Sequence, residues 1–300
     1  MKFNYKKILI FVVIVTLVFV ILTYVKKLIL YHPIVASPVK YDRFYKKISQ
    51  LSGKRENICN FRIKTSDGIL LDTLYLKKSN SKMLIIFFHG NAGNLSMRHD
   101  MIKFLYNYAS VIVFDYRCFG KSTGDNSDLS CAGLERDAMA VWNYVVNNLK
   151  IRPNNISLFG ESLGCSVAIQ LAATLSKTMN QTNYPHSLIL NSPFYSLASM
   201  IKITFDKYHI GFLGTFISYF IGNEYQSDQQ IKYINHRTKI IVAHSLQDEI
   251  VPYKEGKKLY DLINTIRPDT KFINIMGTHN NMGLTDNYIY ALSDLFDDDL

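Results

Sequence analysis

The feature that most constrains the fold is a regular alternation between short apolar runs and helical patterns. The apolar runs are rich in β-branched and aromatic residues and have the length of buried strands: 83–88, 111–114, 156–159, 188–190, 239–243 and 271–275. Helical patterns lie between most of them, at about 97–108, 133–149, 163–177 and 253–265. Strands that alternate with helices predict an α/β fold with a mostly parallel central sheet covered by helices on both faces.

Two stretches depart from this alternation. The runs at 61–65 and 70–76 meet at Asp67-Gly68, a residue pair typical of hairpin turns, so the sheet is expected to begin antiparallel. Residues from about 194 to 236 separate two strands by far more than one crossover helix needs, and they are rich in aromatic residues. Long insertions in compact domains are usually functional. We interpret this one as a small helical cap that supplies an apolar pocket; a helical insert that packs on its own core is the alternative.

The N-terminus carries a long apolar run between lysine pairs. Residues 8–25 contain no charge, and at about 1.5 Å per residue they cover roughly 27 Å, close to the ~30 Å core of a bilayer. A cleaved signal peptide has a shorter apolar region of about 7–15 residues. The pattern predicts a single-pass transmembrane anchor at 1–30 that places the protein on a lipid bilayer, a connector at 31–57 and the α/β domain at 58–300. The lysines are balanced on the two sides of the run, so they do not indicate an orientation.

Charge and cysteine usage exclude several classes of function. The formal net charge is +10, and five of the positive charges flank the apolar run, at Lys2, Lys6, Lys7, Lys26 and Lys27. No basic run is interleaved with aromatic residues, so no nucleic-acid partner is predicted. The four cysteines form no CxxC pair, and no His/Asp/Glu cluster has ligand spacing, so no metal site is predicted.

Two segments match the G-x-S-x-G pattern of a nucleophile elbow. This elbow requires a strand directly before it and a helix directly after it, so that the serine hydroxyl is exposed at the edge of the sheet. The segment at 160–164 follows the apolar run at 156–159 and precedes a helical pattern. The segment at 120–124 is followed by Asp125-Asn126-Ser127-Asp128, which is typical of a loop. Ser162 is therefore the predicted nucleophile and Ser122 a turn residue.

A serine hydroxyl needs a general base, and the base needs an orienting acid. His279 follows the last apolar run directly, and Asp248 follows the run at 239–243. In a parallel sheet, loops after the carboxyl ends of strands meet at one edge. Asp248 and His279 are therefore predicted to complete a triad with Ser162; Glu249 and Asp261 are weaker candidates for the acid.

The oxyanion of the tetrahedral intermediate requires two backbone N–H donors. One is expected from Leu163, the residue after the nucleophile. The other is expected from the glycine-containing loop after the third strand, 89–94, where we place it at Asn91. His89 in the same loop is interpreted as a structural residue.

These segments together resemble a known family. The strings 89–94 (HGNAGN), 115–124 (DYRCFGKSTG), 160–164 (GESLG) and 244–252 (HSLQDEIVP) occur in this order. They are similar to the ABHD-type membrane-tethered serine hydrolases of the α/β-hydrolase superfamily, the group of the fungal bud-emergence proteins. The resemblance covers about residues 55–295 and implies an α/β-hydrolase fold, the triad Ser162, Asp248 and His279, and no cofactor. The family usually has glycine where Cys118 and Ser245 stand.

The resemblance and the aromatic insertion together predict an esterase, lipase or thioesterase. The expected substrate is a carboxylic ester or thioester with an apolar acyl chain. A serine peptidase of the same fold and a non-catalytic membrane scaffold are the alternatives, and labelling by a fluorophosphonate probe would distinguish the scaffold from the enzymes.

Overall fold

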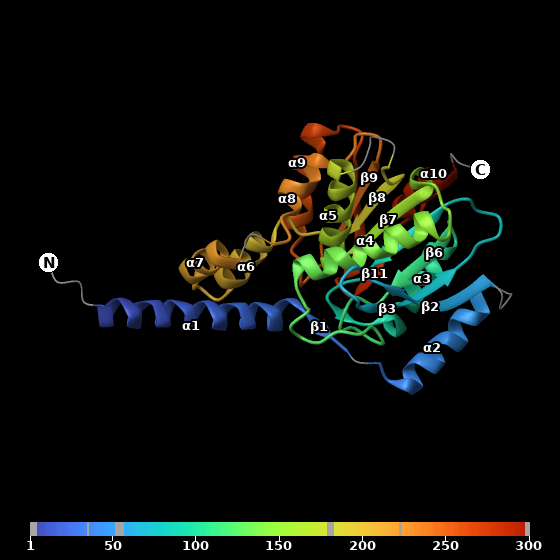
Figure 1. Ribbon diagram of the computed structural model, residues 1–300. Coiled ribbons are helices and arrows are strands. Elements are labelled where there is room, and N and C mark those ends of the chain that lie inside the picture. Colours follow the sequence, from blue (N-terminus) through green and yellow to red (C-terminus); the bar gives the residue numbers. More distant parts are fainter. Residues whose placement is uncertain (1–4, 35, 52–56, 179–182, 222–223, 298–300) are drawn as a thin grey trace.

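A nine-stranded sheet forms the centre of the computed structural model, which describes residues 5–34, 36–51, 57–178, 183–221 and 224–297 (Figure 1). Its strand order is β11-β10-β9-β8-β7-β4-β6-β3-β2. The strands are β2 (Ile58–Lys64), β3 (Leu70–Leu76), β4 (Leu84–Phe88), β6 (Ser110–Phe114), β7 (Ile156–Glu161), β8 (Ser187–Asn191), β9 (Lys239–Ser245), β10 (Lys271–Thr278) and β11 (Asn281–Gly283). Strands β4 and β6 to β10 run parallel, whereas β2, β3 and β11 pair antiparallel with their neighbours.

Helices cover both faces of the sheet because the buried strands are apolar on both sides. Alternate residues of β4 point to opposite faces, so that Ile86 and Phe88 belong to one hydrophobic cluster and Ile85 and Phe87 to the other. Helices α4 (Cys131–Asn147), α5 (Leu163–Thr178) and α9 (Tyr253–Ile266) pack on the first face, and α2 (Pro38–Leu51), α3 (His99–Tyr106) and α10 (Asp286–Asp297) on the second. Short 3-10 helices in the described part of the chain lie at Leu95–Met97, Pro153–Asn155 and Ile231–Tyr233.

The alternation read from the sequence is confirmed. Each of the six apolar runs forms a strand, and a helix lies at each of the four predicted positions. The antiparallel start is also confirmed, because β2 and β3 pair from Lys64↔Leu70 outward around the turn at 67–68. The pattern did not predict β11 and α10, which follow β10 at the end of the chain.

The segment that the pattern assigns to a connector contains regular structure. Helix α2 buries Tyr41, Phe44 and Ile48 against the second face of the sheet. Before it, β1 (His32–Pro33) pairs in parallel with β5 (Ala92–Gly93), a two-residue strand in the loop after β4. Parts of the expected anchor, connector and cap, at 1–4, 35, 52–56 and 222–223, lie outside the described residues.

The first helix, α1 (Tyr5–Leu30), extends away from the domain (Figure 1). In the part of the chain that the structure describes, no helix combines the length and the apolar character needed to cross a bilayer. The prediction of a transmembrane span at 8–25 is therefore not supported.

The described part of the insertion between β8 and β9 contains three α-helices. They are α6 (Leu197–Lys207), α7 (Gly211–Ile221) and α8 (Ser227–Gln230). Helices α6 and α7 pack against each other, and α7 also contacts α1. Helices α1, α6 and α7 therefore project together from one end of the sheet (Figure 1).

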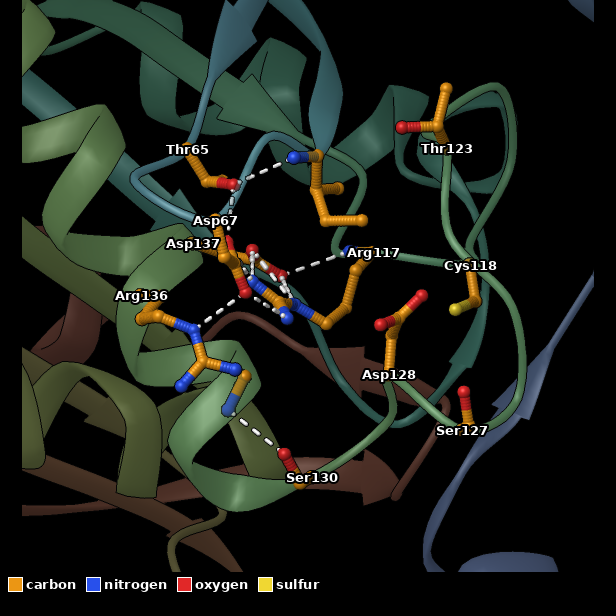
Figure 2. A network of polar contacts seen from close by, with 12 residues as sticks. Thr65, Asp67, Arg117, Cys118, Thr123, Ser127, Asp128, Ser130, Arg136 and Asp137 are labelled. Carbon is orange, nitrogen blue, oxygen red and sulfur yellow. Dashed lines mark hydrogen bonds and ion pairs between the residues drawn. The ribbon is translucent and has the colours of Figure 1, made fainter.

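A buried ion network fixes the β2–β3 hairpin to α4 (Figure 2). The fully buried Arg117 donates to Asp137 at 2.9 and 3.0 Å and to Asp67, in the hairpin turn, at 2.9 and 3.1 Å. Arg136 donates to the same Asp67 at 2.7 Å. Although burial disfavours the charge, these bonds raise the pKa of Arg117, so the guanidinium remains a permanent cation.

Candidate active site

Ser162 lies at a sharp turn between β7 and α5. Its backbone adopts φ +54°, a left-handed conformation that is unusual for residues other than glycine. The turn is held on both sides, because the Ser162 N–H donates to the carbonyl of Asn191 and its carbonyl accepts from the N–H of Cys165, each at 2.9 Å. Strain of this kind persists only where the surrounding structure enforces it, and it is common at catalytic residues.

The glycines on either side of Ser162 are required by close backbone contacts. A Cβ atom at Gly160 would lie 2.5 Å from the Cα of Cys165, and one at Gly164 would lie 2.0 Å from the carbonyl oxygen of Phe88. Both distances are far below van der Waals contact, and the clashing atoms belong to the backbone. The G-x-S-x-G spacing at 160–164 is therefore a steric requirement of this turn.

The second G-x-S-x-G segment has a structural role. The Ser122 hydroxyl donates to the carbonyl of Asp115 at 2.6 Å and accepts from the N–H of Asp72 at 2.8 Å. It thus joins the loop after β6 to strand β3. A hydroxyl that is bonded to the backbone on both sides is poorly suited to attack a substrate.

Asp248 and His279 meet at the edge of the sheet, in the loops after β9 and β10. The His279 Nδ1 atom lies 2.7 and 2.9 Å from the two carboxylate oxygens of Asp248. Because an ionised carboxylate only accepts hydrogen bonds, Nδ1 must carry the proton. This tautomer leaves Nε2 of the neutral ring as a proton acceptor.

Further donors surround the Asp248 carboxylate. Its Oδ1 atom accepts from the N–H groups of Ile250 and Val251 at 3.0 and 2.8 Å. The Nε2 atom of His244 lies 3.5 Å from Oδ2 and 2.9 Å from the carbonyl of Val251. Burial alone would raise the pKa of Asp248, but its bonds to His244 and His279 outweigh this and hold the pKa below its ordinary value. The carboxylate is therefore charged at neutral pH.

The other two candidate acids occupy different positions. Glu249 accepts from the backbone N–H of His279 at 3.0 Å, so it orients the loop and not the ring. Asp261 forms an exposed ion pair with Lys257 on helix α9. Of the three predicted candidates, Asp248 is the one that contacts the His279 ring.

The two predicted oxyanion donors lie beside Ser162. Asn91 and Leu163 both line the same pocket as the serine. Leu163 is the first residue of α5, and N–H groups in the first turn of a helix have no partner within that helix. His89, in the Asn91 loop, is fully buried, its Nδ1 lies 2.7 Å from the carbonyl of Gly90, and burial lowers its pKa to about 3. The buried ring is bonded within its own loop, in agreement with its interpretation as a structural residue.

An apolar pocket of about 240 Å³ opens at Ser162. Helix α6 supplies much of its wall, and the other apolar residues come from the end of α1, the start of α5 and the loops after β8 and β9. Its apolar lining consists of Leu30, Leu163, Phe194, Leu197, Met200, Ile201, Phe205, Ile250 and Val251. The pocket therefore has the chemistry to hold a hydrocarbon chain next to the serine.

The structure brings the predicted residues to one edge of the sheet but does not bond all of them. Among the described residues, the hydrogen-bond chain runs from Asp248 to His279, and no bond joins the ring to the Ser162 hydroxyl. In ligand-free active sites such bonds are often long and tighten when substrate binds. The pattern did not predict the roles of His244, Glu249 or Leu30.

Comparison with known proteins places these features in context. The profile of the alpha/beta hydrolase fold matches residues 84–213. Protein R595 of Acanthamoeba polyphaga mimivirus is 54% identical over 98% of this chain and 99% of its own length. Protein bem46 of Schizosaccharomyces pombe is 29% identical, over 81% of each chain.

An enzyme and a solved structure are also similar. Lysophosphatidylserine lipase ABHD12 of Bos taurus is 29% identical over 72% of this chain, and the match spans 54% of the lipase's length. The crystal structure of an alpha-beta hydrolase from Vibrio vulnificus superimposes with a TM-score of 0.66 at 18% identity, over 90% of this chain and 97% of that one. At this identity the superposition shows the shared fold.

Proposed function

This chain belongs to the α/β-hydrolase superfamily as an ABHD-type serine hydrolase of the esterase or lipase type. From that premise we propose that it cleaves acyl esters or thioesters of lipid-like substrates, with Ser162, His279 and Asp248 as its triad. The observation that carries this proposal is the contact between Asp248 and His279 at the sheet edge where Ser162 opens into an apolar pocket.

In the first half-reaction, Nε2 of His279 takes the proton of the Ser162 hydroxyl as its oxygen attacks the substrate carbonyl. The N–H groups of Asn91 and Leu163 bind the oxygen that becomes negative. Collapse of this intermediate expels the alcohol or thiol, which takes the proton from His279, and an acyl-serine remains.

In the second half-reaction, His279 takes a proton from water, and the resulting hydroxide attacks the acyl-serine. The acid leaves, and the Ser162 oxygen recovers its proton. The charged Asp248 holds the ring in one tautomer throughout and stabilises the imidazolium that forms twice in the cycle.

The apolar lining supports an acyl chain, and the related ABHD12 lipase suggests the first substrate to test. That protein is named for lysophosphatidylserine, a single-chain lipid ester. We therefore propose that a single-chain phospholipid ester, with its acyl chain against α6, is a better substrate than a short soluble ester.

The decisive experiment compares two serines of the same motif. Wild-type protein should hydrolyse lysophosphatidylserine and p-nitrophenyl acyl esters and should react with a fluorophosphonate probe. Ser162→Ala should lose labelling and about 10⁴-fold or more of kcat. Ser122→Ala, in the second G-x-S-x-G segment, is the matched control and should still be labelled. Labelling that survives in Ser162→Ala but disappears in Ser122→Ala would reverse the assignment.

A further inference from the structure

The segment 30–34 begins at the last residue of α1 and contacts two parts of the proposed site, the pocket and the loop after β4. Leu30 lines the pocket that holds Ser162, and the next residues form β1, which pairs with β5 in the loop that carries Asn91. We propose that this segment is a working part of the active site: Leu30 limits the acyl chain, and β1 positions the oxyanion donor. The inference rests on the proposed function and extends it to specificity.

Backbone hydrogen bonds attach the segment to the oxyanion loop. The N–H of His32 donates to the carbonyl of Asn91 at 2.9 Å, and the N–H of Ile34 donates to the carbonyl of Gly93 at 3.4 Å. The Asn94 side-chain amide in turn donates to the carbonyl of Ile34 at 2.9 Å. Fixing the Asn91 and Gly93 carbonyls restricts the backbone of this loop, and the loop carries the Asn91 N–H.

A buried pair of tyrosines attaches the same segment to the base of the insertion. The hydroxyls of Tyr31 and Tyr225 lie 2.6 Å apart, although the residues are 194 positions apart in the chain. Burial raises the pKa of both tyrosines, so both remain protonated. The Tyr225 carbonyl accepts from the N–H of Leu197, the first residue of α6. The segment thus joins the oxyanion loop to the helix that supplies the pocket wall.

The position of Leu30 makes it a determinant of chain length. The lining of the same pocket also includes Thr204 and Phe205 of α6. A larger side chain at this position would occupy space that a long acyl chain needs, whereas a short acyl group close to Ser162 would be less affected. Differences of one methylene in an apolar pocket change discrimination by about 10-fold or more.

The first test measures kcat/KM for acetyl, hexanoyl and decanoyl esters with the full chain. For Leu30→Trp the ratio of decanoyl to acetyl kcat/KM should fall at least about tenfold relative to wild type. Val39→Trp, at an exposed position of α2, controls for adding an indole. An unchanged ratio in Leu30→Trp would overturn the role of Leu30 in specificity.

The second test addresses the positioning of Asn91. His32→Pro removes the N–H that donates to the Asn91 carbonyl, and His32→Ala keeps it. The kcat of the proline variant should be roughly 10- to 100-fold below that of the alanine variant, with similar KM, because the hydrogen bond acts on the transition state. Equal kcat values would overturn the positioning role. If the proline variant does not fold, Asn94→Asp decides the question. It replaces the amide that donates to the Ile34 carbonyl by a carboxylate oxygen and keeps an acceptor for Ser96, so it should lower kcat while KM is unchanged.

The two proposals fail in different ways. If wild-type protein hydrolyses no acyl ester and Ser162 does not react with the fluorophosphonate, the proposed function itself is wrong. If wild-type protein turns over these esters with Ser162 and the Leu30 and His32 variants keep the wild-type profile, only the inference about the segment 30–34 is wrong.

Discussion

Two buried carboxylates in this molecule, Asp137 and Asp248, each pair with a basic side chain, but the two basic side chains differ in chemistry. At the β2–β3 hairpin, Asp137 pairs with Arg117, and both side chains are fully buried. At the sheet edge, Asp248 pairs with His279 at a comparable distance. An arginine never releases its proton in a protein, whereas a neutral imidazole can accept one and return it. The first pair can therefore only hold elements together, and the second can also carry out proton transfer.

The two carboxylates also differ in how their surroundings affect their charge. Burial is the largest influence on Asp137 and raises its pKa in spite of the bonds to Arg117. For Asp248, hydrogen bonds to the carboxylate outweigh burial and lower the pKa. Removing the cation from a buried ion pair is costly, because it leaves an uncompensated buried charge. The Asp248 carboxylate would still accept hydrogen bonds from the N–H groups of Ile250 and Val251. Substitutions in the two pairs should therefore affect different measurements.

The largest expected effect is on catalysis and follows from Asp248→Asn. An asparagine amide can present a donor to the ring and favour the wrong tautomer, so kcat should fall by about 10⁴-fold. Steady-state ester hydrolysis checks this. Glu249→Gln is the matched control, because Glu249 bonds the backbone of His279 and not its ring. If kcat falls further in Glu249→Gln than in Asp248→Asn, Glu249 and not Asp248 is the acid that orients the ring.

The next effect is on stability and follows from Arg117→Met. Removing the guanidinium leaves Asp137 buried and unpaired, so the free energy of unfolding should fall by about 3–5 kcal/mol. Denaturant unfolding measures it. Arg136→Met removes a partly exposed member of the same network and should cost about 1 kcal/mol or less. If the free energy of unfolding falls equally in the two variants, the burial of Arg117 does not make its contribution larger than that of Arg136.

The smallest effect is expected at Asp67, in the hairpin turn. Bonds from Arg117 hold its pKa below the ordinary value, but its side chain is about one-third exposed, so Asp67→Asn should cost about 1 kcal/mol or less. A lowered pKa means that the contribution is present above about pH 4 and is lost as the pH falls further. The difference in unfolding free energy between wild type and Asp67→Asn should therefore shrink from pH 6 to pH 3. A difference that grows toward pH 3 would contradict this sign.

The parallel arrangement of the central strands was predictable, because the apolar runs and helical patterns that determine it can be read locally in the sequence. Uniformly apolar runs separated by helices require a parallel sheet, and this arrangement alone places the loops after β9 and β10 near each other at one edge. The contact between Asp248 and His279 follows from that rule, although the residues are 31 positions apart. Glycines at 160 and 164 were informative for the same reason, because a strand-to-helix turn leaves no room for Cβ atoms there.

Other features were not predicted from the sequence. The Arg117 network joins residues 20 and 50 positions apart on three elements, and no periodicity relates them. The spacing of Tyr41, Phe44 and Ile48 fits one face of a helix and could have revealed α2, but the surrounding charges obscured it. Cys118 adopts φ +67° where the family usually has glycine; this position therefore retains the left-handed turn without the residue that normally indicates it.

The pairing of β1 with β5 has a practical consequence for anyone who shortens this protein. A chain that begins at residue 37 would keep every member of the proposed triad and all nine strands of the sheet, and would look complete by its secondary structure. It would lack Leu30 of the pocket lining and the N–H groups of His32 and Ile34, which donate to the Asn91 loop. If the segment acts as we propose, low activity in such a fragment would reflect its absence and not an inactive enzyme.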